Sequence, residues 1–304
     1  KDFLVNDVKV EVASNPEFLA QGSAVRDTLH AARIIIGTES KAAEEILMKI
    51  YEPFGIPIVS VSRRSAEMIK YACNDFLALK ISYMNDIANL CELVGADIED
   101  VARGMSYDAR IGANFLKAGI GYGGSCFPKD TKALKFLAEK AGYHLETVEA
   151  AVAVNAKQKT RLFQKASDRM ITFQGLKAAV LGLAFKPGTD DLREAPSLDN
   201  VELLLESGAE IYAYDPVAAD HFKKKYPEGE LKKGKIFYVE KPEDALKGAN
   251  ICFIFTEWKE IKAVPVCKYK ELMQTPLVYD GRNIYEVKEM KENGVEYYSI
   301  GRQA

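Results

Sequence analysis

Residues 178–183 read Ala-Ala-Val-Leu-Gly-Leu and open the part of the chain whose pattern decides the fold. Further apolar runs follow this one, with helical segments between most of them. Such alternation is typical of a parallel sheet covered by helices on both faces, so we predict a doubly wound, Rossmann-like α/β domain. Ligands of such sheets bind beyond the carboxyl ends of the strands. The predicted strands are residues 178–183, 210–214, 236–239, 251–256, 277–280 and 296–300.

Upstream of this sheet the pattern is helical. Residues 65–94 contain no proline or glycine and repeat apolar side chains every three to four positions, which predicts one long helix. About 30 residues of helix span about 45 Å, so we expect it to link two domains and to offer a face to a second subunit. A shorter helix is predicted to begin after Asp97, and another to run from Asn155 to about Met170.

The first 60 residues predict a strand–helix–strand piece. Apolar runs at 8–13, 33–37 and 56–61 flank a helical stretch at 41–51. Lys1 is not preceded by a strand, turn and helix, so we expect this piece to be the remnant of an N-terminal Rossmann-like domain whose opening half is absent from the sequence.

Composition excludes several classes of function. The 304 residues carry a net charge of −3, which gives no reason to expect nucleic acid as a partner. No apolar run approaches the roughly 20 residues that cross a bilayer, and no signal-peptide pattern is present, so we expect no membrane partner and a cytoplasmic location. The five cysteines are scattered and the chain has only three histidines, which supports neither a disulfide framework nor a metal site.

The most informative segment for chemistry is residues 119–130, Gly-Ile-Gly-Tyr-Gly-Gly-Ser-Cys-Phe-Pro-Lys-Asp. We predict a helix from Pro128, in the first helical position, to a stop at Gly142. Cys126 would then lie just ahead of unpaired N–H groups, a setting that lowers the pKa of a thiol and favours a nucleophilic thiolate. The alternative is a buried structural cysteine beside a flexible turn.

The C-terminal sheet lacks the usual dinucleotide fingerprint. Residues 182–188 read Gly-Leu-Ala-Phe-Lys-Pro-Gly, which is not Gly-x-Gly-x-x-Gly, so we do not expect NAD there in the usual way. Lys186, Arg193 and Arg282 follow predicted strands, which favours a nucleotide of another kind. The alternative for all three is ordinary surface charge.

Five motifs in register resemble the UDP-glucose/GDP-mannose dehydrogenase family, in particular its UDP-glucose 6-dehydrogenases. They are residues 14–19 (SNPEFL), 67–74 (EMIKYACN), 123–130 (GGSCFPKD), 182–194 (GLAFKPGTDDLRE) and 279–283 (YDGRN). The family's N-terminal Gly-x-Gly-x-x-Gly region is missing, and a piece of this extent alone is expected to be inactive. The resemblance implies three domains: the rest of an NAD-binding domain (1–60), a central helical dimerisation domain (61–170) and a UDP-sugar-binding domain (171–304).

The resemblance also implies a reaction. UDP-glucose would be oxidised to UDP-glucuronate in a four-electron, NAD-dependent process, with polysaccharide biosynthesis as a setting. The thiol of Cys126 would capture the aldehyde as a thiohemiacetal, which is oxidised to a thioester and then hydrolysed. Lys70 and Asn74, four residues apart on one helix face, would line the same site. Asp130 would order the catalytic water, and Glu17 would move a proton.

Binding roles follow from the same resemblance. The implied dimer or higher homo-oligomer rests on Arg110, which would reach into a neighbouring subunit's site, and guanidinium groups suit phosphates. Arg193, Gly124 and Lys129 are implied for the cofactor. The residues implied for the nucleotide sugar are Phe18, Leu19, Arg110, Asn114, Lys117, Tyr122, Gly123, Phe185, Lys186 and Arg282.

The chain departs from the family at Gln21, where a second glutamate is common, and at Ala31–Ala32, where Pro-Asp is common. An amide cannot titrate, so we place the proton-transfer role on Glu17 or on water held by Asp130. Three other functions stay open. They are a sister dehydrogenase for GDP-mannose or a UDP-N-acetylhexosamine, a non-catalytic nucleotide-sugar-binding or dimerisation module, and a thiol hydrolase with a Cys–His pair.

Overall fold

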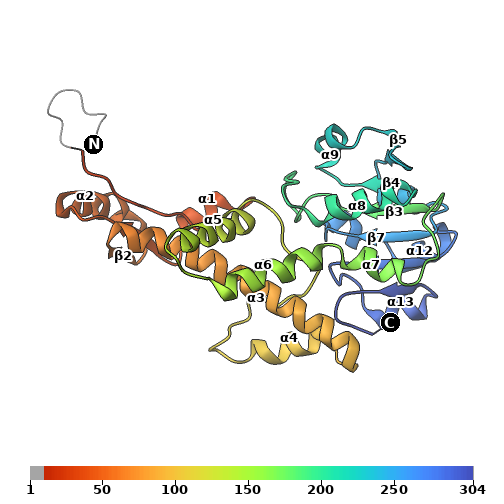
Figure 1. The fold of residues 1–304 in the computed structure, drawn as a ribbon, viewed down its shortest axis with the longest axis horizontal. Coiled ribbons are helices and arrows are strands. Elements are labelled where there is room, and N and C mark those ends of the chain that lie inside the picture. The colour runs from red at the N-terminus through yellow and green to blue at the C-terminus, as the bar shows by residue number, and fades with distance from the viewer. Residues whose placement is uncertain (1–9, 304) are drawn as a thin grey trace. The chain divides into compact units, whose positions relative to one another are not determined.

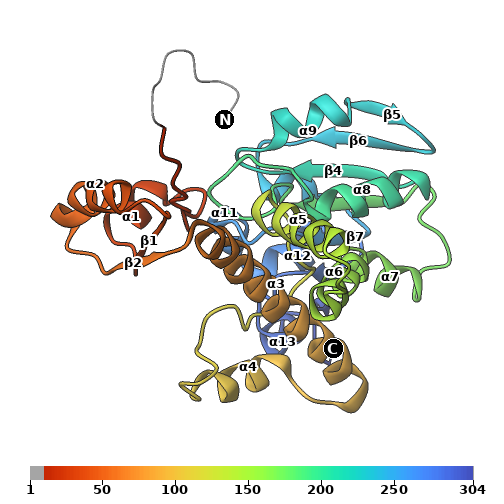
Figure 2. The ribbon, with the colours of Figure 1, turned by 60° about the vertical axis from the view of Figure 1, so that its left-hand side comes forward.

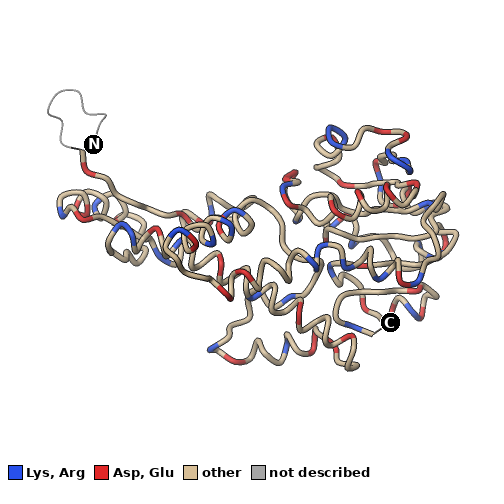
Figure 3. Tube along the Cα trace, viewed as in Figure 1, with Lys and Arg blue, Asp and Glu red and all other residues tan. Residues whose placement is uncertain are grey.

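The chain forms two compact units, Lys1–Asn74 and Asp75–Ala304, in a computed structural model that describes residues 10–303 (Figure 1). Lys and Arg residues are interspersed with Asp and Glu along the trace of both units (Figure 3). The boundary between the units lies inside a long helix, so one element contributes residues to both. The division into three domains at residues 60 and 170 stays a prediction.

The first unit is a small βαβ piece. Its strands β1 (Ile34–Gly37) and β2 (Ile58–Val61) pair in parallel, with α2 (Lys41–Tyr51) and the 3₁₀ turn η1 (Glu52–Phe54) between them. The predicted strand–helix–strand is therefore confirmed. A short helix α1 (Ala24–Leu29) was not predicted.

The strand expected at residues 8–13 is wrong over its described part. Residues 10–13 form no strand, and only Ser14 makes an isolated antiparallel bridge, to Gly37. Val8 and Lys9 lie outside the described residues. Among the described residues the segment pairs only through the bridge of Ser14 to Gly37, and a strand is stable only when its backbone groups are paired.

The helical part of the chain begins with α3 (Arg63–Val94), whose 32 residues confirm the predicted long helix. Helix α4 (Ile98–Ser106) follows, and its N-cap Asp97 accepts a hydrogen bond from the Glu99 amide, as the sequence predicted. Helix α5 (Cys126–Lys140) is followed by α6 (Glu146–Lys159) and α7 (Arg161–Ser167), which are separated at Thr160. The single helix predicted from Asn155 to Met170 is thus two helices.

Helix α5 begins at Cys126, two residues earlier than predicted. Pro128 therefore occupies the third position of the helix and not the first. The first N–H groups of a helix need no intrahelical partner, so proline is tolerated through the first turn. Cys126 is consequently part of the helix and not ahead of it. Gly142, with φ 71°, lies just beyond the end of the helix as predicted.

The C-terminal sheet has seven strands in the order β5-β6-β4-β3-β7-β8-β9. Figure 2 shows β5, β6 and β4 side by side at one edge of this sheet. All neighbours pair in parallel except β5 and β6. The order reverses at β3, so right-handed connections place the helices that follow on opposite faces. The doubly wound fold is confirmed, and its switch point lies between β3 and β7. The strands are β3 (Lys177–Leu181), β4 (Glu210–Tyr214), β5 (Gly229–Leu231), β6 (Gly234–Tyr238), β7 (Ile251–Ile254), β8 (Leu277–Asp280) and β9 (Glu296–Tyr298).

The sheet core is apolar and closed. Val180, Phe253 and Val278 on three adjacent strands are fully buried, as the continuous apolar runs of a parallel sheet require. The short antiparallel strand β5 was missed because its three residues lie between turns and carry no repeat. The helices that follow β3 are α8 (Pro196–Glu206), α9 (Ala219–Lys225), α10 (Pro242–Leu246), α11 (Lys259–Lys262), α12 (Val266–Leu272) and α13 (Val287–Glu292). No helix in the described part of the chain has the length and apolarity that a membrane span requires.

Candidate functional site

Lys70 and Glu17 are paired in the first unit. The Lys70 Nζ lies 2.9 Å from a carboxylate oxygen of Glu17, and the lysine side chain is only 18% exposed. Lys70 is therefore paired with Glu17 and largely shielded from solvent. The Phe18 ring lies beside them, with the Arg33 guanidinium 4.1 Å and the Lys70 Nζ 5.5 Å from its centroid. The structure thus brings three predicted site residues together.

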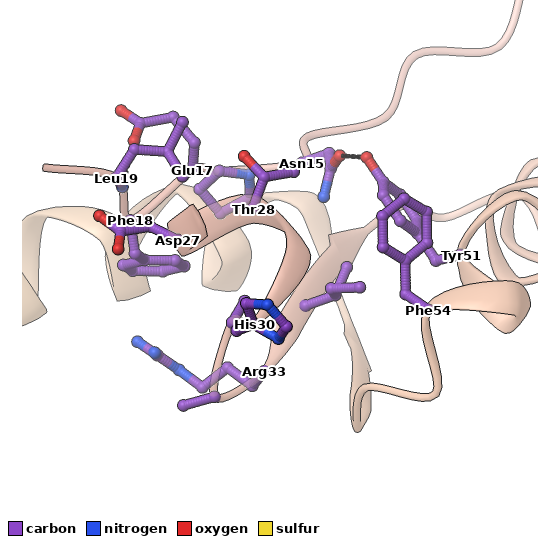
Figure 4. Close-up of a pocket in the computed structure, with 14 residues that line it drawn as sticks. Asn15, Glu17, Phe18, Leu19, Asp27, Thr28, His30, Arg33, Tyr51 and Phe54 are labelled. Carbon is purple, nitrogen blue, oxygen red and sulfur yellow. Dashed lines mark hydrogen bonds between the residues drawn. The ribbon is translucent and has the colours of Figure 1, made fainter. Parts of the chain in front are cut away.

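A pocket of about 330 Å³ opens next to this pair (Figure 4). Leu19 lines it, and Asp27 closes the adjacent turn by accepting hydrogen bonds from the Ser23 hydroxyl and the Ala20 amide. The Ser23 hydrogen bond is the main reason why the pKa of Asp27 is lowered. Other side chains around the pocket are Asn15, Thr28, His30, Arg33, Tyr51 and Phe54.

Two further positions of the first unit bear on the site. Asn74 is buried, at 8% exposure, one helical turn after Lys70 on α3. Gln21 is exposed and falls outside the residues that line the pocket. The departure from the family pattern at Gln21 thus lies on the surface of this unit.

In the second unit, the glycine-rich loop of residues 119–124 is held by buried side-chain amides. The Gly119 N–H donates to Asn85 Oδ1 at 2.8 Å, and the Gly119 carbonyl accepts from Gln158 Nε2 at 2.7 Å. Asn155 makes a matched pair with Tyr122, accepting from its N–H at 2.8 Å and donating to its carbonyl at 3.1 Å. The loop is therefore built into the protein and is not a free flap.

Sequence reasoning missed these three amides. Asn85 lies 34 residues before Gly119, and Asn155 lies 33 residues after Tyr122, so no local pattern links donor and acceptor. A weak signal was present, because Asn155 and Gln158 stand on one face of a helix that is otherwise rich in small and apolar residues. Buried polar groups require partners, so such amides indicate a loop to be held.

The same loop is docked on the loops that follow the sheet strands. The Gly124 N–H donates to the Arg193 carbonyl at 2.7 Å, and the Ile120 N–H donates to the Gly281 carbonyl at 3.1 Å. A Cβ on Gly123 would lie 2.4 Å from the Glu194 carbonyl oxygen, and one on Gly124 would lie 2.8 Å from the Phe185 ring. Glycine is required at both places because of this close approach.

Cys126 is exposed at the first position of α5, directly after the loop. The Ser125 N-cap makes no capping hydrogen bond with its side chain, so it does not satisfy the amides of the first turn. Arg193 lies close enough to interact electrostatically with Cys126. The pKa of Arg193 is raised, chiefly by its hydrogen bonds to Asp191 and to a smaller degree by Cys126. The alternative of a buried structural cysteine is therefore wrong.

Asp130, one turn into α5, is 1% exposed and forms an ion pair with Lys129. Its neighbour Thr131 donates a hydrogen bond to the Phe127 carbonyl at 2.8 Å. Tyr122, at 8% exposure, has a pKa raised to about 12, mainly by burial. The start of α5 thus combines one exposed thiol with a buried carboxylate.

A pocket of about 260 Å³ lies beside the loop, near the carboxyl ends of β7 and β8. The predicted residues Lys117 and Arg282 line it. Sequence reasoning missed Glu257 and Lys262, which line it as well, although Glu257 directly follows a predicted strand. The guanidinium of Arg282 donates to the carbonyls of Phe255 and Phe185 at 2.8 and 3.2 Å, so this side chain also ties loops together.

Other predicted residues lie away from this pocket. Arg110 is exposed and forms a bidentate pair with Asp108, the nearest contact being 2.6 Å. Asn114 is also exposed, and Lys186 stands over the Phe185 ring at 5.5 Å. Within the described residues, no group of three or more His, Cys, Asp or Glu could hold a metal ion.

Three family models match the chain. The central domain of the UDP-glucose/GDP-mannose dehydrogenase family matches residues 64–157, and the UDP-binding domain of the same family matches residues 179–287. The family's NAD-binding domain matches residues 1–55. Part of an N-terminal NAD-binding domain is therefore present, and the cofactor that this match implies is NAD.

In the described βαβ piece, the pyrophosphate of a dinucleotide would bind at the turn between β1 and the start of α2, because helix N-termini bind phosphates. There the Glu39 carboxylate accepts the Arg63 N–H at 3.2 Å, and the Ser40 hydroxyl accepts the Ala43 N–H at 3.4 Å. A carboxylate and an already capped helix do not fit the pyrophosphate of NAD. The phosphate-binding part of an NAD site is not formed by this turn.

Curated relatives and solved structures agree with the family models. UDP-glucose 6-dehydrogenase YwqF of Bacillus subtilis (strain 168) is 50% identical over the whole chain, which covers 68% of that protein. A UDP-glucose dehydrogenase structure from Pyrobaculum islandicum gives a TM-score of 0.87 at 36% identity, over 98% of this chain and 65% of that one. The UDP-D-ManNAc dehydrogenase structure from Pyrococcus horikoshii gives a TM-score of 0.82 at 27% identity, over 98% of this chain and 66% of that one. The chain thus spans about two thirds of the length of these proteins, and it belongs to the UDP-glucose/GDP-mannose dehydrogenase family.

Proposed function

We propose that this chain is the thiol-bearing and nucleotide-sugar-binding part of an NAD-dependent UDP-glucose 6-dehydrogenase, which oxidises UDP-glucose to UDP-glucuronate. The observation that carries the proposal is the rigid glycine loop that delivers an exposed Cys126 to the start of α5. The 50% identical relative bears that enzyme's name. A cytoplasmic location goes with the proposal.

The thiol is required because an aldehyde has no hydride that it can give up until a nucleophile adds to its carbon. When bound, NAD⁺ would supply the acceptor for the hydride that is released in each of the two oxidations. The sulfur of Cys126 forms a bond to the aldehyde carbon, giving a thiohemiacetal whose oxidation yields a thioester. Water then forms the new C–O bond, the C–S bond breaks, and the thiol is regenerated with the carboxylate product.

Charged groups near the sulfur suit this chemistry. The oxyanion that forms when sulfur adds to the aldehyde is stabilised by a positive charge and by the N–H groups of a helix start. We propose Arg193, whose charge interacts with Cys126, as the source of this positive charge, besides the cofactor contact predicted for it. The proposed roles of the other residues are oxyanion or proton stabilisation by Lys70, a hydrogen bond to water by Asn74, ordering of that water by Asp130, and proton transfer by Glu17.

The pocket lined by Lys117, Lys262 and Arg282 is the proposed site of the UDP group. Three cationic side chains suit a diphosphate, and the position at the carboxyl ends of parallel strands is the usual place for a nucleotide. Glu257 lies 3.3 Å from Arg282 and fixes its direction. Tyr122 and Gly123, also predicted for the nucleotide sugar, belong to the glycine loop beside this pocket.

A homodimer is part of the proposal because α3 exposes an apolar stripe. Phe76, Tyr83 and Leu90 follow each other at seven-residue intervals and are 62%, 53% and 53% exposed. A seven-residue repeat of apolar side chains is the pattern by which long helices pair. Replacing Tyr83 and Leu90 together by Glu should halve the mass seen by sedimentation, whereas Ile171→Glu, at an exposed position outside α3, should not. A monomeric parent protein would contradict the proposal.

The test of the reaction is Cys126→Ser in the full protein, with Cys267→Ser, an exposed cysteine of α12, as the matched control. UDP-glucose is supplied, and NADH and UDP-glucuronate are both measured. We expect Cys126→Ser to lose glucuronate formation by at least about 10³-fold and Cys267→Ser to keep it. Glucuronate formed by Cys126→Ser at the parent rate would remove the thioester from the mechanism.

A sister dehydrogenase is the second candidate, because the Pyrococcus horikoshii structure carries the name of a UDP-D-ManNAc enzyme and has the same fold over 98% of the chain. Turnover of UDP-glucose, GDP-mannose and a UDP-N-acetylhexosamine by the same preparation separates the candidates. We expect UDP-glucose to give the highest kcat/KM. A higher value with either of the other sugars would transfer the assignment to that substrate.

A further inference from the structure

Asp215, the residue directly after β4, is a buried carboxylate without a role in the proposed function so far. It is 4% exposed. Its Oδ2 accepts hydrogen bonds from the N–H groups of Leu183 at 2.7 Å and Ala184 at 3.0 Å, in the segment after β3. Its Oδ1 accepts from the N–H groups of Val217 at 2.9 Å and Ala218 at 2.7 Å. Four backbone donors thus converge on one side chain, and an ionised carboxylate, which only accepts, satisfies them all.

A fifth donor comes from the segment after β7. The Nε1–H of Trp258, the single tryptophan of the chain, donates to Asp215 Oδ2 at 2.9 Å, and Trp258 is 6% exposed. Because β4, β3 and β7 are neighbours in the sheet, Asp215 joins the segments that leave the carboxyl ends of three adjacent strands. Nucleotides bind at this edge of a doubly wound sheet, so the carboxylate lies where it can shape a binding site.

The guanidinium of Arg282 is held by two of these three segments. Its Nη2 donates to the Phe185 carbonyl at 3.2 Å, and its Nε lies 3.3 Å from Glu257 Oε2. Phe185 directly follows one of the donors to Asp215, and Glu257 directly precedes another. Arg282 lines the pocket proposed for the UDP group, and its side chain is 16% exposed. The contacts that direct this cation therefore come from segments that Asp215 anchors.

We propose that Asp215 is a positioning residue for the UDP pocket, whose carboxylate anchors the segments after β3 and β7 and thereby fixes the direction of the Arg282 guanidinium. A guanidinium binds phosphate through a planar fork of N–H groups, so its direction decides how well a diphosphate is held. Asp215 is outside the described residues that line this pocket and acts through Arg282. The inference rests on the proposed place of the UDP group, and it does not depend on the reaction at Cys126.

The test measures the binding of UDP alone, by calorimetry on the full protein without NAD or a sugar. Four forms are compared: parent, Asp215→Asn, Arg282→Ala and the double variant. Asn keeps the size of Asp215, but its amide nitrogen cannot accept the N–H groups that one carboxylate oxygen now accepts.

We expect Asp215→Asn to weaken UDP binding about ten-fold, because a misdirected guanidinium loses part of its contact with phosphate. In the Arg282→Ala background the same substitution should have no further effect, since the effects of residues that act through one another are not additive.

Asn250→Ala is the matched control for a general loss of stability. Asn250 stands directly before β7 and accepts the Lys177 N–H at 2.9 Å, so it joins β3 and β7 at their amino ends, opposite to Asp215. This variant should be less stable in urea and should bind UDP with the affinity of the parent. An equal loss of UDP affinity in Asn250→Ala and Asp215→Asn would indicate a structural role alone and would overturn the proposal.

Trp258→Phe keeps the proposal falsifiable if Asp215→Asn does not fold. It removes one donor to Asp215 and keeps an aromatic ring in place, so the segment after β7 is loosened while the segment after β3 stays anchored. We expect UDP binding to weaken about three-fold, again only where Arg282 is present. Parent affinity for UDP in Asp215→Asn, or in Trp258→Phe where Asp215→Asn does not fold, would overturn the inference.

The remaining outcomes separate this inference from the proposed function. A loss in Asp215→Asn that persists undiminished in the Arg282→Ala background would overturn the role through Arg282 and leave the UDP pocket in place. UDP affinity unchanged in Arg282→Ala would refute the proposed UDP pocket, and the inference would fall with it. If glucuronate formation survives Cys126→Ser while the Arg282-dependent loss of UDP affinity is seen, the proposed reaction fails and the positioning role stands.

Discussion

The glycine loop of the second unit and the Lys70–Glu17 pair of the first unit are both predicted parts of one site, yet they are held by different forces. The loop is fixed by neutral amides that are almost completely buried, among them Asn85 at 0% and Asn155 at 5% exposure. The pair is fixed by charge, and the Glu17 side chain is 57% exposed. Buried neutral hydrogen bonds are insensitive to salt, whereas exposed ion pairs are screened and weak. The loop should therefore be a rigid scaffold and the pair an adjustable contact.

The largest effect is expected for Asn155→Ala. It leaves the N–H and the carbonyl of Tyr122 without partners in a buried place, and each costs roughly 1–3 kcal/mol, so stability should fall by about 3–4 kcal/mol. Urea unfolding gives the total, and amide hydrogen exchange of residues 119–124 shows whether the loop opens.

The matched control is Asn293→Ala, which removes one exposed hydrogen bond at the end of α13 and should cost less than about 0.5 kcal/mol. An equal loss in both variants would contradict the view that the loop is a scaffold.

A somewhat smaller effect is expected for Gly123→Ala, because the added Cβ would lie 2.4 Å from a backbone oxygen of Glu194. The Glu194 backbone is itself in a left-handed conformation, with φ 54°, and has little room to yield. We expect a loss of about 3 kcal/mol and weaker UDP-glucose binding in calorimetry.

Gly104→Ala is the control, since nothing lies within 4 Å of a Cβ there and the position is inside α4. Alanine should stabilise that helix by about 0.5–1 kcal/mol. If Gly123→Ala were tolerated as well as Gly104→Ala, the docking of the loop would be unimportant.

Local sequence patterns were sufficient to predict much of this architecture. Uninterrupted spacing predicted α3 almost to the residue, and the alternation of strands with helices predicted the doubly wound sheet. The segment from Gly119 to Asp130 was singled out because glycines, a thiol and a helix start occur in one short stretch. Those features depend on neighbours in sequence, which a pattern can show.

What the sequence could not show depends on long-range contacts. The partners of the glycine loop are more than 30 residues away, and the left-handed backbone of Glu194 has no residue-type signal. Asp75 looks like one more polar residue on a helix until its burial and its neighbour Asp130 are known. Nothing local distinguishes a solvated aspartate from a buried one whose carboxylate oxygens have no hydrogen-bond partner among the described residues.

A moderate gain in stability, in contrast to the losses above, is expected for Asp75→Asn at high pH. The folded-state pKa of Asp75 is raised from 3.8 to about 6, so the folded protein binds this proton more tightly than the unfolded chain does. Stability is therefore lost as the pH rises from about 4 through 6. The full shift corresponds to at most about 3 kcal/mol, and we expect Asp75→Asn to be about 2 kcal/mol more stable than the parent at pH 8.

At pH 4 the same variant should differ little from the parent, because Asp75 is then largely protonated in the folded state. Urea unfolding at both pH values measures the difference. A stabilisation that is equal at pH 4 and pH 8 would arise from packing and not from the charge. It would contradict the view that the charge of Asp75 destabilises the folded protein.

The smallest effect is expected at the Lys70–Glu17 pair. Its 2.9 Å contact joins a half-buried lysine to an exposed carboxylate, and such pairs contribute roughly 0.2–1 kcal/mol. A double-mutant cycle with Lys70→Met and Glu17→Gln should give a coupling energy of about 0.5 kcal/mol that falls as salt is raised. The same salt series should leave the effect of Asn155→Ala unchanged, because neutral buried amides do not respond to screening. A coupling that resists salt would mean that Lys70 and Glu17 are shielded from solvent. In that case the pair would be part of the rigid scaffold. A carboxylate fixed in this way would not suit the proton-transfer role proposed for Glu17.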